Sequence, residues 1–323
     1  MRGALRAVRS GARRLLHSVA NRFDPPSVVL LYHRVAELSS DPHALAVHPE
    51  RFRAQMERLA RAAALTRFEN LGRGPAPAAA VTFDDGYADN LGAALPILES
   101  FAIPAVFFVT TGFVESGREF WWDEIHRLVP ETGPLPDRFE LPAGPRWPEL
   151  DLAEGGGRAR LTRRLHATLR ALRAEPREAL FDAIAAWSGR DRAARRDHRP
   201  LTIAEVGRLA QSPLATLGAH GVTHTAFTVL DGPGRKDEML RSKAALEKWT
   251  GRAVTAFAFP YGERRDVPPA AIAEASEAGF AAIALNQPGQ VRSRTDRRRI
   301  PRFVVGDWSG EEFSRRLRRM WTA

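Results

Sequence analysis

Short apolar runs alternate with longer amphipathic segments along most of the chain. Each run has five or six residues and is nearly continuous, without alternating polar positions. Such runs are typical of strands in a parallel sheet that is covered on both faces. We expect six strands, at Ser27–Tyr32, Ala78–Phe83, Ala105–Thr110, Ala215–Ala219, Val254–Phe259 and Ala281–Leu285.

Helices are expected between these strands, because apolar residues recur there at helical spacing. Pro49 suits a first helical position, Thr202 and Glu205 form a capping box, and Gly251 and Gly279 suit helix ends. The expected helices are Pro49–Ala64, Asn90–Ser100 with a kink or late start at Pro96, Thr202 to about Ala210, Arg235–Thr250, Pro269–Ala278 and 311–321. Strands that alternate with helices predict an α/β fold with a parallel sheet or barrel.

Residues 115–200 interrupt this alternation. They contain the pair Trp121–Trp122, a stretch rich in proline and glycine (133–157) and an arginine-rich helical stretch (159–188). We interpret residues 115–200, called the insertion segment below, as a lid over the site, with a second small domain as the less favoured alternative. Residues 1–24 are interpreted as a basic leader or amphipathic helix, so that 25–323 form one barrel domain.

Polar residues follow four of the predicted strands at the point where each strand ends. His33 follows the first strand, Asp84, Asp85 and Gly86 follow the second, His220 and His224 the fourth, and Pro260 and Tyr261 the fifth. The carboxyl ends of parallel strands meet at one edge, where α/β folds assemble their sites. We therefore expect these side chains to share one site.

The spacing of these residues suits a metal. His220 and His224 would face the same side of a helical turn. Asp84 and its neighbour Asp85 point to opposite sides of an extended segment, so one can bind a metal while the other faces a substrate. Two histidines and a carboxylate leave positions open for water and substrate on a divalent ion. The alternatives are a turn or helix cap at the aspartates and two unrelated histidines.

Three of these motifs carry a resemblance to a known family. The run Thr82–Gly86 and the pair His220/His224 resemble the first two signature motifs of the polysaccharide deacetylases with a NodB-type domain (carbohydrate esterase family 4), and Phe259–Gly262 resembles the third. Two further runs, Leu31–Val35 and Phe120–Glu124, resemble members that accompany exopolysaccharide biosynthesis. The resemblance extends from about Ser27 to Trp308, interrupted by the insertion segment.

The resemblance implies a distorted (β/α) barrel and a divalent metal, usually zinc, held by Asp85, His220 and His224. It makes Asp84 the general base that takes a proton from metal-bound water, the nucleophile. It also implies that the backbone N–H of Tyr261, next to the substrate-binding Pro260, stabilises the oxyanion together with the metal. The implied reaction removes N-acetyl groups from a polysaccharide or its lipid-linked precursor.

The chain departs from the family pattern at two positions. Ala258 and Phe259 stand where the family often has an arginine that orients the base, and Ile283–Gln287 lacks the late histidine that protonates the leaving amine. A general acid is still needed, because an amine anion is a poor leaving group. His33 is our candidate for it, and a histidine hydrogen-bonded in the barrel mouth is the alternative.

Several further residues have candidate roles in or around the site. Arg302 is a candidate for orienting Asp84, and Asp307–Trp308 resembles a family motif that supports the active site. The pair Trp121 and Trp122 either stacks on sugar rings or is a buried anchor of the insertion segment. We expect His43 and His48 at the surface, and the amphipathic tail helix packed on the barrel or, alternatively, on a membrane surface.

Composition narrows the classes of function. Hydrophobic residues make up 44% of the 323 residues, which permits a large core and excludes global disorder. The chain has no cysteine, which excludes disulfides, thiolate metal sites and a cysteine nucleophile. The net charge of +10 suits nucleic acid, anionic lipid or acidic glycan. We expect no nucleic-acid partner, because the basic stretches do not interleave aromatic residues as a base-stacking surface would.

The sequence also bears on the cellular location of the protein and on alternative functions. No run of 18 apolar residues is present, and arginines break the N-terminal stretch where a secretory signal would be apolar. We expect a cytoplasmic enzyme, with peripheral contact at the inner membrane through its basic amphipathic ends. A non-catalytic glycan-binding or assembly protein and a basic scaffold are the alternatives. The pair Asp84–Asp85 favours catalysis, because binding alone needs no base beside a metal ligand.

Overall fold

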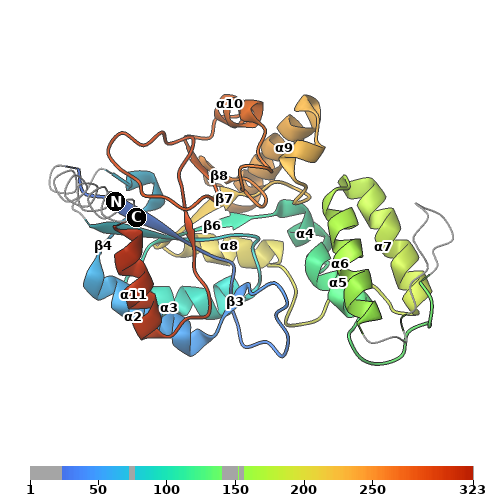
Figure 1. Cartoon of the computed structure of the whole chain (residues 1–323). Coiled ribbons are helices and arrows are strands. Elements are labelled where there is room, and N and C mark those ends of the chain that lie inside the picture. Colours follow the sequence, from blue (N-terminus) through green and yellow to red (C-terminus); the bar gives the residue numbers. More distant parts are fainter. Residues whose placement is uncertain (1–23, 73–76, 140–151, 153–155, 323) are drawn as a thin grey trace, which may run out of the picture.

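A curled parallel sheet forms the centre of the molecule in the computed structural model, which describes residues 24–72, 77–139, 152 and 156–322 (Figure 1). Its strand order is β10-β1-β5-β6-β7-β8-β9, and β4 pairs with β5 off this path. The strands are β1 (Ser27–Tyr32), β4 (Ala64–Leu65), β5 (Ala78–Phe83), β6 (Ala105–Val109), β7 (Ala215–Ala219), β8 (Ala256–Ala258), β9 (Ala282–Ala284) and β10 (Phe303–Val304). A separate parallel pair joins β2 (Arg34–Val35) and β3 (Ala46–Val47). The half-barrel confirms the predicted α/β fold.

All six predicted strands form, and the two missed strands of the main sheet are the shortest ones. β1 and β5 are buried along their whole length and pair in register from Ser27↔Ala78 to Tyr32↔Phe83. β4 and β10 have two residues each, too few to give a hydrophobic pattern. β10 nevertheless adds the last strand of the sheet beside β1.

The helices include the predicted ones, with boundaries close to those expected, and two that were not predicted, at Thr111–Ser116 and Trp121–Leu128. They are α2 (Pro49–Ala62), α3 (Leu95–Ser100), α4 (Thr111–Ser116), α5 (Trp121–Leu128), α6 (Gly157–Arg170), α7 (Ala174–Ser188), α8 (Ile203–Gln211), α9 (Gly232–Thr250), α10 (Pro269–Glu277) and α11 (Gly310–Met320). Short 3-10 turns lie at Phe68–Asn70 and Phe227–Val229. The capping box of Thr202 and Glu205 forms, and a π-helical turn, Asn90–Ala94, precedes Pro96 as the expected irregularity.

Two layers of side chains cover the two faces of the sheet. Tyr32, Phe83 and Phe107 belong to the large outer cluster, where the rings of Phe83 and Phe107 stack at 5.0 Å. The inner cluster inside the curl is smaller and combines five alanines with larger side chains such as Val29, Phe108 and Ile300. Figure 1 shows α2, α3 and α11 below the curled sheet and α9 and α10 above it, and side chains of all five helices belong to the outer cluster. The apolar face of α11 is buried, as the packing interpretation expected, through Phe313, Leu317 and Met320.

The insertion segment connects β6 and β7, which are neighbours in the sheet. Its predicted arginine-rich helix is two helices, α6 and α7, and with α5 they surround their own apolar cluster. Figure 1 shows these three helices grouped beyond the end of the sheet. Residues 1–23, to which the leader interpretation applies, lie outside the described residues. Among the described helices, none has the length and apolarity needed to span a bilayer.

The inner cluster generates a stability prediction at Gly218. A Cβ atom there would lie 2.4 Å from the Phe108 ring, so Gly218→Ala must displace a fully buried side chain. We expect the free energy of unfolding to fall by about 1–3 kcal/mol in chemical denaturation. The control is Gly207→Ala in α8, where a Cβ meets an ordinary contact at 4.0 Å and alanine favours the helix. Equal free energies of unfolding for Gly218→Ala and Gly207→Ala would contradict the close approach of the Phe108 ring to Gly218.

Candidate active site

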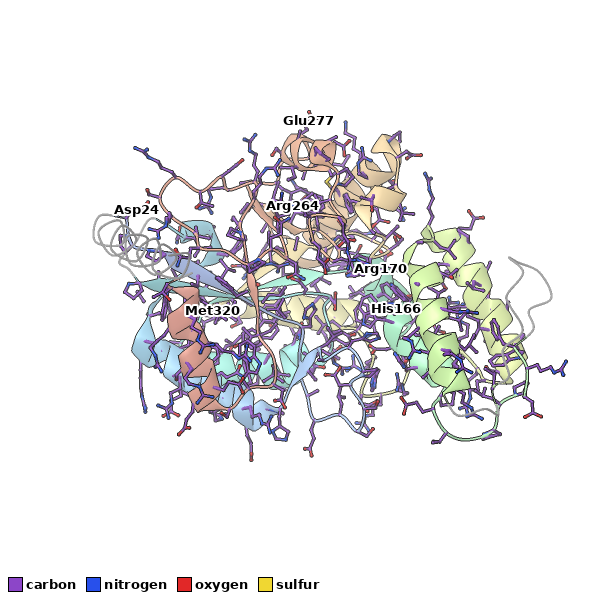
Figure 2. The ribbon with its side chains drawn as sticks, in the orientation of Figure 1. Asp24, His166, Arg170, Arg264, Glu277 and Met320 are labelled. Carbon is purple, nitrogen blue, oxygen red and sulfur yellow. The ribbon has the colours of Figure 1, made fainter. Side chains whose placement is uncertain are left out.

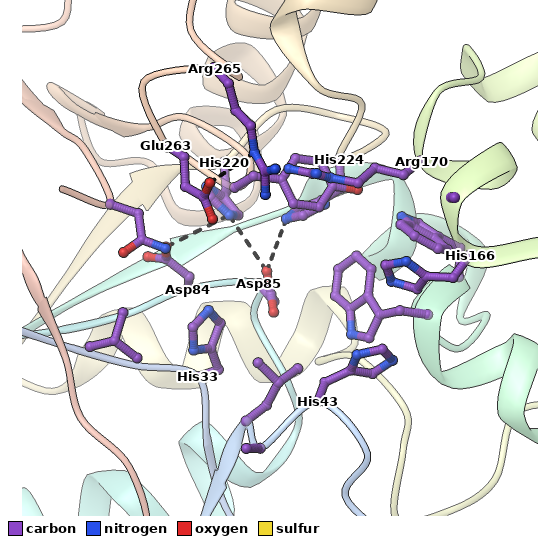
Figure 3. Close-up of a pocket in the computed structure, with 18 residues that line it drawn as sticks. His33, His43, Asp84, Asp85, His166, Arg170, His220, His224, Glu263 and Arg265 are labelled. Carbon is purple, nitrogen blue, oxygen red and sulfur yellow. Dashed lines mark ion pairs between the residues drawn. The ribbon is translucent and has the colours of Figure 1, made fainter. Parts of the chain in front are cut away.

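The carboxyl ends of β1, β5, β7 and β8 meet at one cavity of about 530 Å³ (Figure 3). All predicted site residues except Pro260 line it, namely His33, Asp84, Asp85, Trp121, Trp122, His220, His224 and Tyr261. Pro260 is buried beside Tyr261 and does not line the cavity. The parallel register therefore brings together residues that lie far apart in the sequence.

Asp85, His220 and His224 form a compact group at the floor of this cavity. Asp85 Oδ1 lies 3.5 Å from His220 Nε2 and 3.3 Å from His224 Nε2, and all three residues are buried. Two ligands with bonds of about 2.0–2.2 Å to one tetrahedral ion lie about 3.3–3.5 Å apart. His220 Nδ1 donates to the carbonyl of Ala258 at 2.8 Å, which leaves Nε2 for a metal. The donor set and its spacing fit a divalent ion.

The loop that carries the two histidines is not the helical turn that the spacing suggested. Residues 220–224 leave β7 in an irregular conformation, so the reason given for their shared face is wrong. The loop is held by the buried Glu238 of α9, which accepts the N–H groups of Val222 at 2.6 Å and Thr223 at 2.9 Å. Arg177 of α7 donates to the Thr223 carbonyl. Tertiary contacts therefore shape the loop.

Backbone strain is concentrated at this site. Among the described residues, five other than glycine have positive φ, and three of them are Asp85 (74°), His224 (52°) and Tyr261 (61°). Each such residue costs about 1–3 kcal/mol and persists only where its surroundings enforce it. Gly221 also has a positive φ, and a Cβ there would lie 2.8 Å from Glu238 Oε2. The fold thus holds the site residues in conformations that isolated segments would not adopt.

Asp84 is fixed by a buried arginine. Arg302 donates from Nη1 to Asp84 Oδ1 at 2.6 Å and from Nη2 to Oδ2 at 2.7 Å, and the arginine side chain is fully buried. Burial alone would raise the pKa of Asp84, but Arg302, followed by His220 and His33, lowers it below its ordinary value. Asp84 is therefore held in one orientation and ionised. The arginine suggested from the sequence occupies the expected contact, although it comes from the segment before β10.

Burial and hydrogen bonds shift the pKa values of Asp85 and His224 in the metal-binding group. Burial would raise the pKa of Asp85, but hydrogen bonds from His220 and His224 lower it far below its ordinary value. Burial lowers the pKa of His224 to about 4 despite its contact with Asp85. His224 is therefore neutral at pH 7, which is the form that binds metals.

His33 lies beside both aspartates in Figure 3. His33 is half-buried, and its backbone carbonyl accepts a hydrogen bond from the side-chain amide of Asn90 at 2.9 Å. The ring makes no hydrogen bond to another described residue, and its charge contributes to the lowered pKa of both Asp84 and Asp85. The imidazole thus lines the cavity near both aspartates.

Trp121 and Trp122 form the wall on the insertion side and are almost completely buried, at 1% and 5% exposure. Trp122 stacks on Phe120 at 5.0 Å, donates to the Tyr87 hydroxyl at 2.8 Å and approaches His224 at 4.5 Å between ring centroids. This burial favours the anchor interpretation of the pair over stacking on sugar.

Two side chains outside the main motifs have contacts that were not expected. His43 is partly exposed, as predicted, but it also lines the cavity, and its Nε2 lies 3.2 Å from that of His126. Asp307 does not support the site, since its carboxylate accepts the His48 N–H and the Arg51 side chain at the start of α2. His48 is half-exposed and caps α2.

Several cavity residues carried no signal in the sequence. They are His166 and Arg170 of the insertion segment, with Glu263, Arg265 and Asn286 from the loops after β8 and β9. Figure 2 shows His166 and Arg170 on the side of the insertion that faces the sheet. No motif contains them, because only the packing of distant segments brings them to the cavity.

The chain matches a protein-family model and several solved structures. A family model described as polysaccharide deacetylase matches residues 72–132 and 161–283, more than half of the chain. No match was found among the curated proteins. Among solved structures, the Streptococcus pyogenes deacetylase PplD in complex with acetate matches with 16% identity, a TM-score of 0.58 and coverage of 90% of this chain and 97% of that one.

Two further solved structures are similar. IcaB from Ammonifex degensii has 18% identity and a TM-score of 0.57, covering 92% of this chain and 97% of that one. BC0361, a polysaccharide deacetylase from Bacillus cereus, has 18% identity and a TM-score of 0.57, covering 91% and 69%. At these identities the structural likeness shows a shared fold.

The geometry of Asp85, His220 and His224 predicts that one divalent metal ion binds at this site. Zinc at about 100 times Kd should raise the free energy of unfolding by about 2.7 kcal/mol. His224→Ala should lose both the bound metal and this stabilisation, whereas His48→Ala, which removes a distant histidine, should keep both. Elemental analysis and thermal unfolding with and without chelator measure the two effects. Retention of the metal by His224→Ala would refute the assignment.

Proposed function

The chain belongs to the polysaccharide deacetylase family, and we propose that it is a metal-dependent hydrolase that removes N-acetyl groups from a polysaccharide or its lipid-linked precursor. The observation that carries the proposal is the group Asp85, His220 and His224 with the Arg302-bound Asp84 beside it in one cavity. The family consists of hydrolases that act on carbon–nitrogen bonds other than peptide bonds. The acetate bound in the Streptococcus pyogenes deacetylase is the product that this reaction would release.

Asp85, His220 and His224 would hold the metal, and zinc suits a set of two histidines and a carboxylate. When bound there, the ion would lower the pKa of a water ligand and polarise the amide carbonyl of the substrate.

Asp84 would act as the general base. Arg302 binds both of its oxygens, which fixes the carboxylate and keeps it ionised. Oδ2 of Asp84 lies 3.9 Å from His220 Nε2, next to the metal-binding group. A water that attacks the substrate carbonyl from this position can pass its proton to Asp84 as the new carbon–oxygen bond forms.

Tyr261 and His33 would complete the reaction. The N–H of Tyr261 is not used in the backbone hydrogen bonds among the described residues, and the positive φ of the residue sets its direction. It would donate to the oxygen that becomes negatively charged after attack. His33 would protonate the leaving nitrogen as the carbon–nitrogen bond breaks, giving acetate and a free amine.

The non-catalytic alternative remains a glycan-binding or assembly protein on the same fold. A buried arginine that fixes a carboxylate beside a metal group favours catalysis, because binding alone does not require it. We also propose a cytoplasmic location with peripheral contact at the inner membrane. The exposed arginines of α11, Arg315, Arg318 and Arg319, would provide part of that contact.

Acetate release tests the proposed reaction. Zinc-loaded protein should release acetate from N-acetylated oligosaccharides, and Asp84→Asn should reduce kcat at least a hundredfold by removing the base. His33→Ala should reduce kcat by about 10²–10⁴-fold, because it removes the acid. His48→Ala serves as the control. If zinc-bound wild-type protein binds oligosaccharides yet releases no acetate, the non-catalytic alternative replaces the enzyme.

The ion pair between Arg302 and Asp84 generates a separate pH prediction. Arg302→Met removes the main cause that lowers the Asp84 pKa and leaves the burial that raises it. The base then protonates at higher pH, so the acid limb of the kcat/KM profile should move to higher pH. Arg302→Lys keeps the positive charge, so its acid limb should lie between those of the wild-type protein and Arg302→Met. Circular dichroism controls for folding, and an unmoved acid limb in folded Arg302→Met would show that the arginine does not tune the base.

A further inference from the structure

The two histidines of the metal-binding group are held in different ways. His220 Nδ1 donates to the Ala258 carbonyl at 2.8 Å, so a backbone acceptor fixes the orientation of its ring. The buried Nδ1 of His224 has no hydrogen-bond partner among the described residues. A histidine that binds a metal through one ring nitrogen normally donates from the other to an acceptor that orients the ring. Some other contact must therefore orient the ring of His224.

Aromatic rings surround His224 instead. Its ring centroid lies 4.5 Å from that of Trp122 and 4.7 Å from that of Tyr261, with interplanar angles of 57° and 74°. The χ2 torsion of a histidine has broad preferences, so neighbouring rings must limit its rotation. Figure 3 shows His224 on the side of the site that faces the insertion segment, to which Trp122 belongs. The direction of the His224 ring therefore depends on where the indole of Trp122 lies.

Hydrogen bonds fix the edge of the Trp122 indole. Its Nε1 donates to the Tyr87 hydroxyl at 2.8 Å, and this hydroxyl donates to Asp123 Oδ2 at 2.6 Å. An indole N–H can only donate and a phenol has one proton, so both bonds have a fixed direction. All three side chains are buried, and a lost partner would leave a buried polar group unpaired. The indole therefore has one favoured position.

Tyr87 is itself anchored to the barrel. It lies two residues after Asp85, in the loop that follows β5. The Arg34 guanidinium lies 4.2 Å from the centre of the Tyr87 ring and is held by Asp89 at 2.9 Å. The ring also packs on Phe120 at 4.4 Å between centroids. Tyr87 thus connects the loop that carries one metal ligand to the insertion segment, which packs on another.

We propose that Tyr87 and Asp123 are positioning residues for His224 and that they act through Trp122. This inference rests on the proposed function, because it takes His224 as a ligand of the metal. The hydroxyl and the carboxylate fix the indole, and the indole limits the rotation of the imidazole. His224 Nε2 then stays directed toward Asp85, whose Oδ1 lies 3.3 Å away. The insertion segment would thus set the metal affinity, although none of the three ligands belongs to it.

Zinc affinity, measured by competition with a chromophoric chelator, tests the proposal. Tyr87→Phe keeps the aromatic ring and removes only the hydroxyl. We expect the Kd for zinc to rise by about tenfold, the lower end of the effect of partners that orient metal ligands. Tyr32→Phe is the matched control, because Tyr32 is also fully buried and its hydroxyl donates to Gln55 at 2.9 Å. The control loses a comparable hydrogen bond and should keep the wild-type zinc affinity.

Cobalt(II) in place of zinc gives a second readout, because its visible absorption depends on the geometry of the ligands. The spectrum should change in Tyr87→Phe and stay unchanged in Tyr32→Phe. Asp123→Asn keeps an oxygen that accepts from Tyr87, so it should retain the wild-type spectrum and zinc affinity. Asp123→Ala removes the acceptor and should alter both. The two substitutions at Asp123 repeat the test without changing Tyr87.

A double-mutant cycle shows whether the residues act along one path. Trp122→Phe should also weaken zinc binding, and adding Tyr87→Phe should weaken it little further, because the hydroxyl acts only through the indole. Unchanged zinc affinity and cobalt spectrum in Tyr87→Phe, with circular dichroism as evidence of folding, would overturn the positioning role, and so would additive losses in the double variant. Wild-type protein that binds no zinc would instead refute the metal-dependent function, and this inference with it.

Discussion

The ion pair between Asp84 and Arg302 joins the two parts of the chain on which the site depends. Arg302 is fully buried, and a guanidinium in such a place needs a compensating carboxylate. Asp84 supplies it from the end of β5, while Arg302 precedes β10, the strand that pairs with β1. The Arg302 guanidinium also lies 5.4 Å from the centre of the Phe108 ring, inside the curl of the sheet. One contact therefore fixes both the proposed base and the last strand.

The metal-binding group depends on a second set of constraints that act on the backbone. Asp85, His224 and Tyr261 all have positive φ, so their conformations require support from outside the loops. Glu238 of α9 and Arg177 of α7 provide it for the histidine loop by binding the backbone at Val222 and Thr223. Because Arg177 belongs to the insertion segment, this segment contributes to the shape of the site as well as to its wall.

The insertion segment forms one wall of the site. Its residues Trp121, His166 and Arg170 line the cavity, and Arg170 pairs with Asp266 of the loop after β8 at 2.7 Å. A second cavity of about 410 Å³ adjoins the site cavity beside β10 and α11 and shares Asn286 and Val304 with it.

The longer strands, most helix ends and the grouping of the site residues could be predicted from the amino-acid pattern, because buried parallel strands have a strong apolar pattern and their carboxyl ends converge. Local motifs also identified Asp84, Asp85, His220 and His224. Other features depend on contacts that form only in the folded chain. β10 is too short to give a pattern, and the loop at His220 is irregular where spacing suggested a helix. The places of His43, Arg177 and the second cavity depend on contacts between distant segments, which no local pattern records.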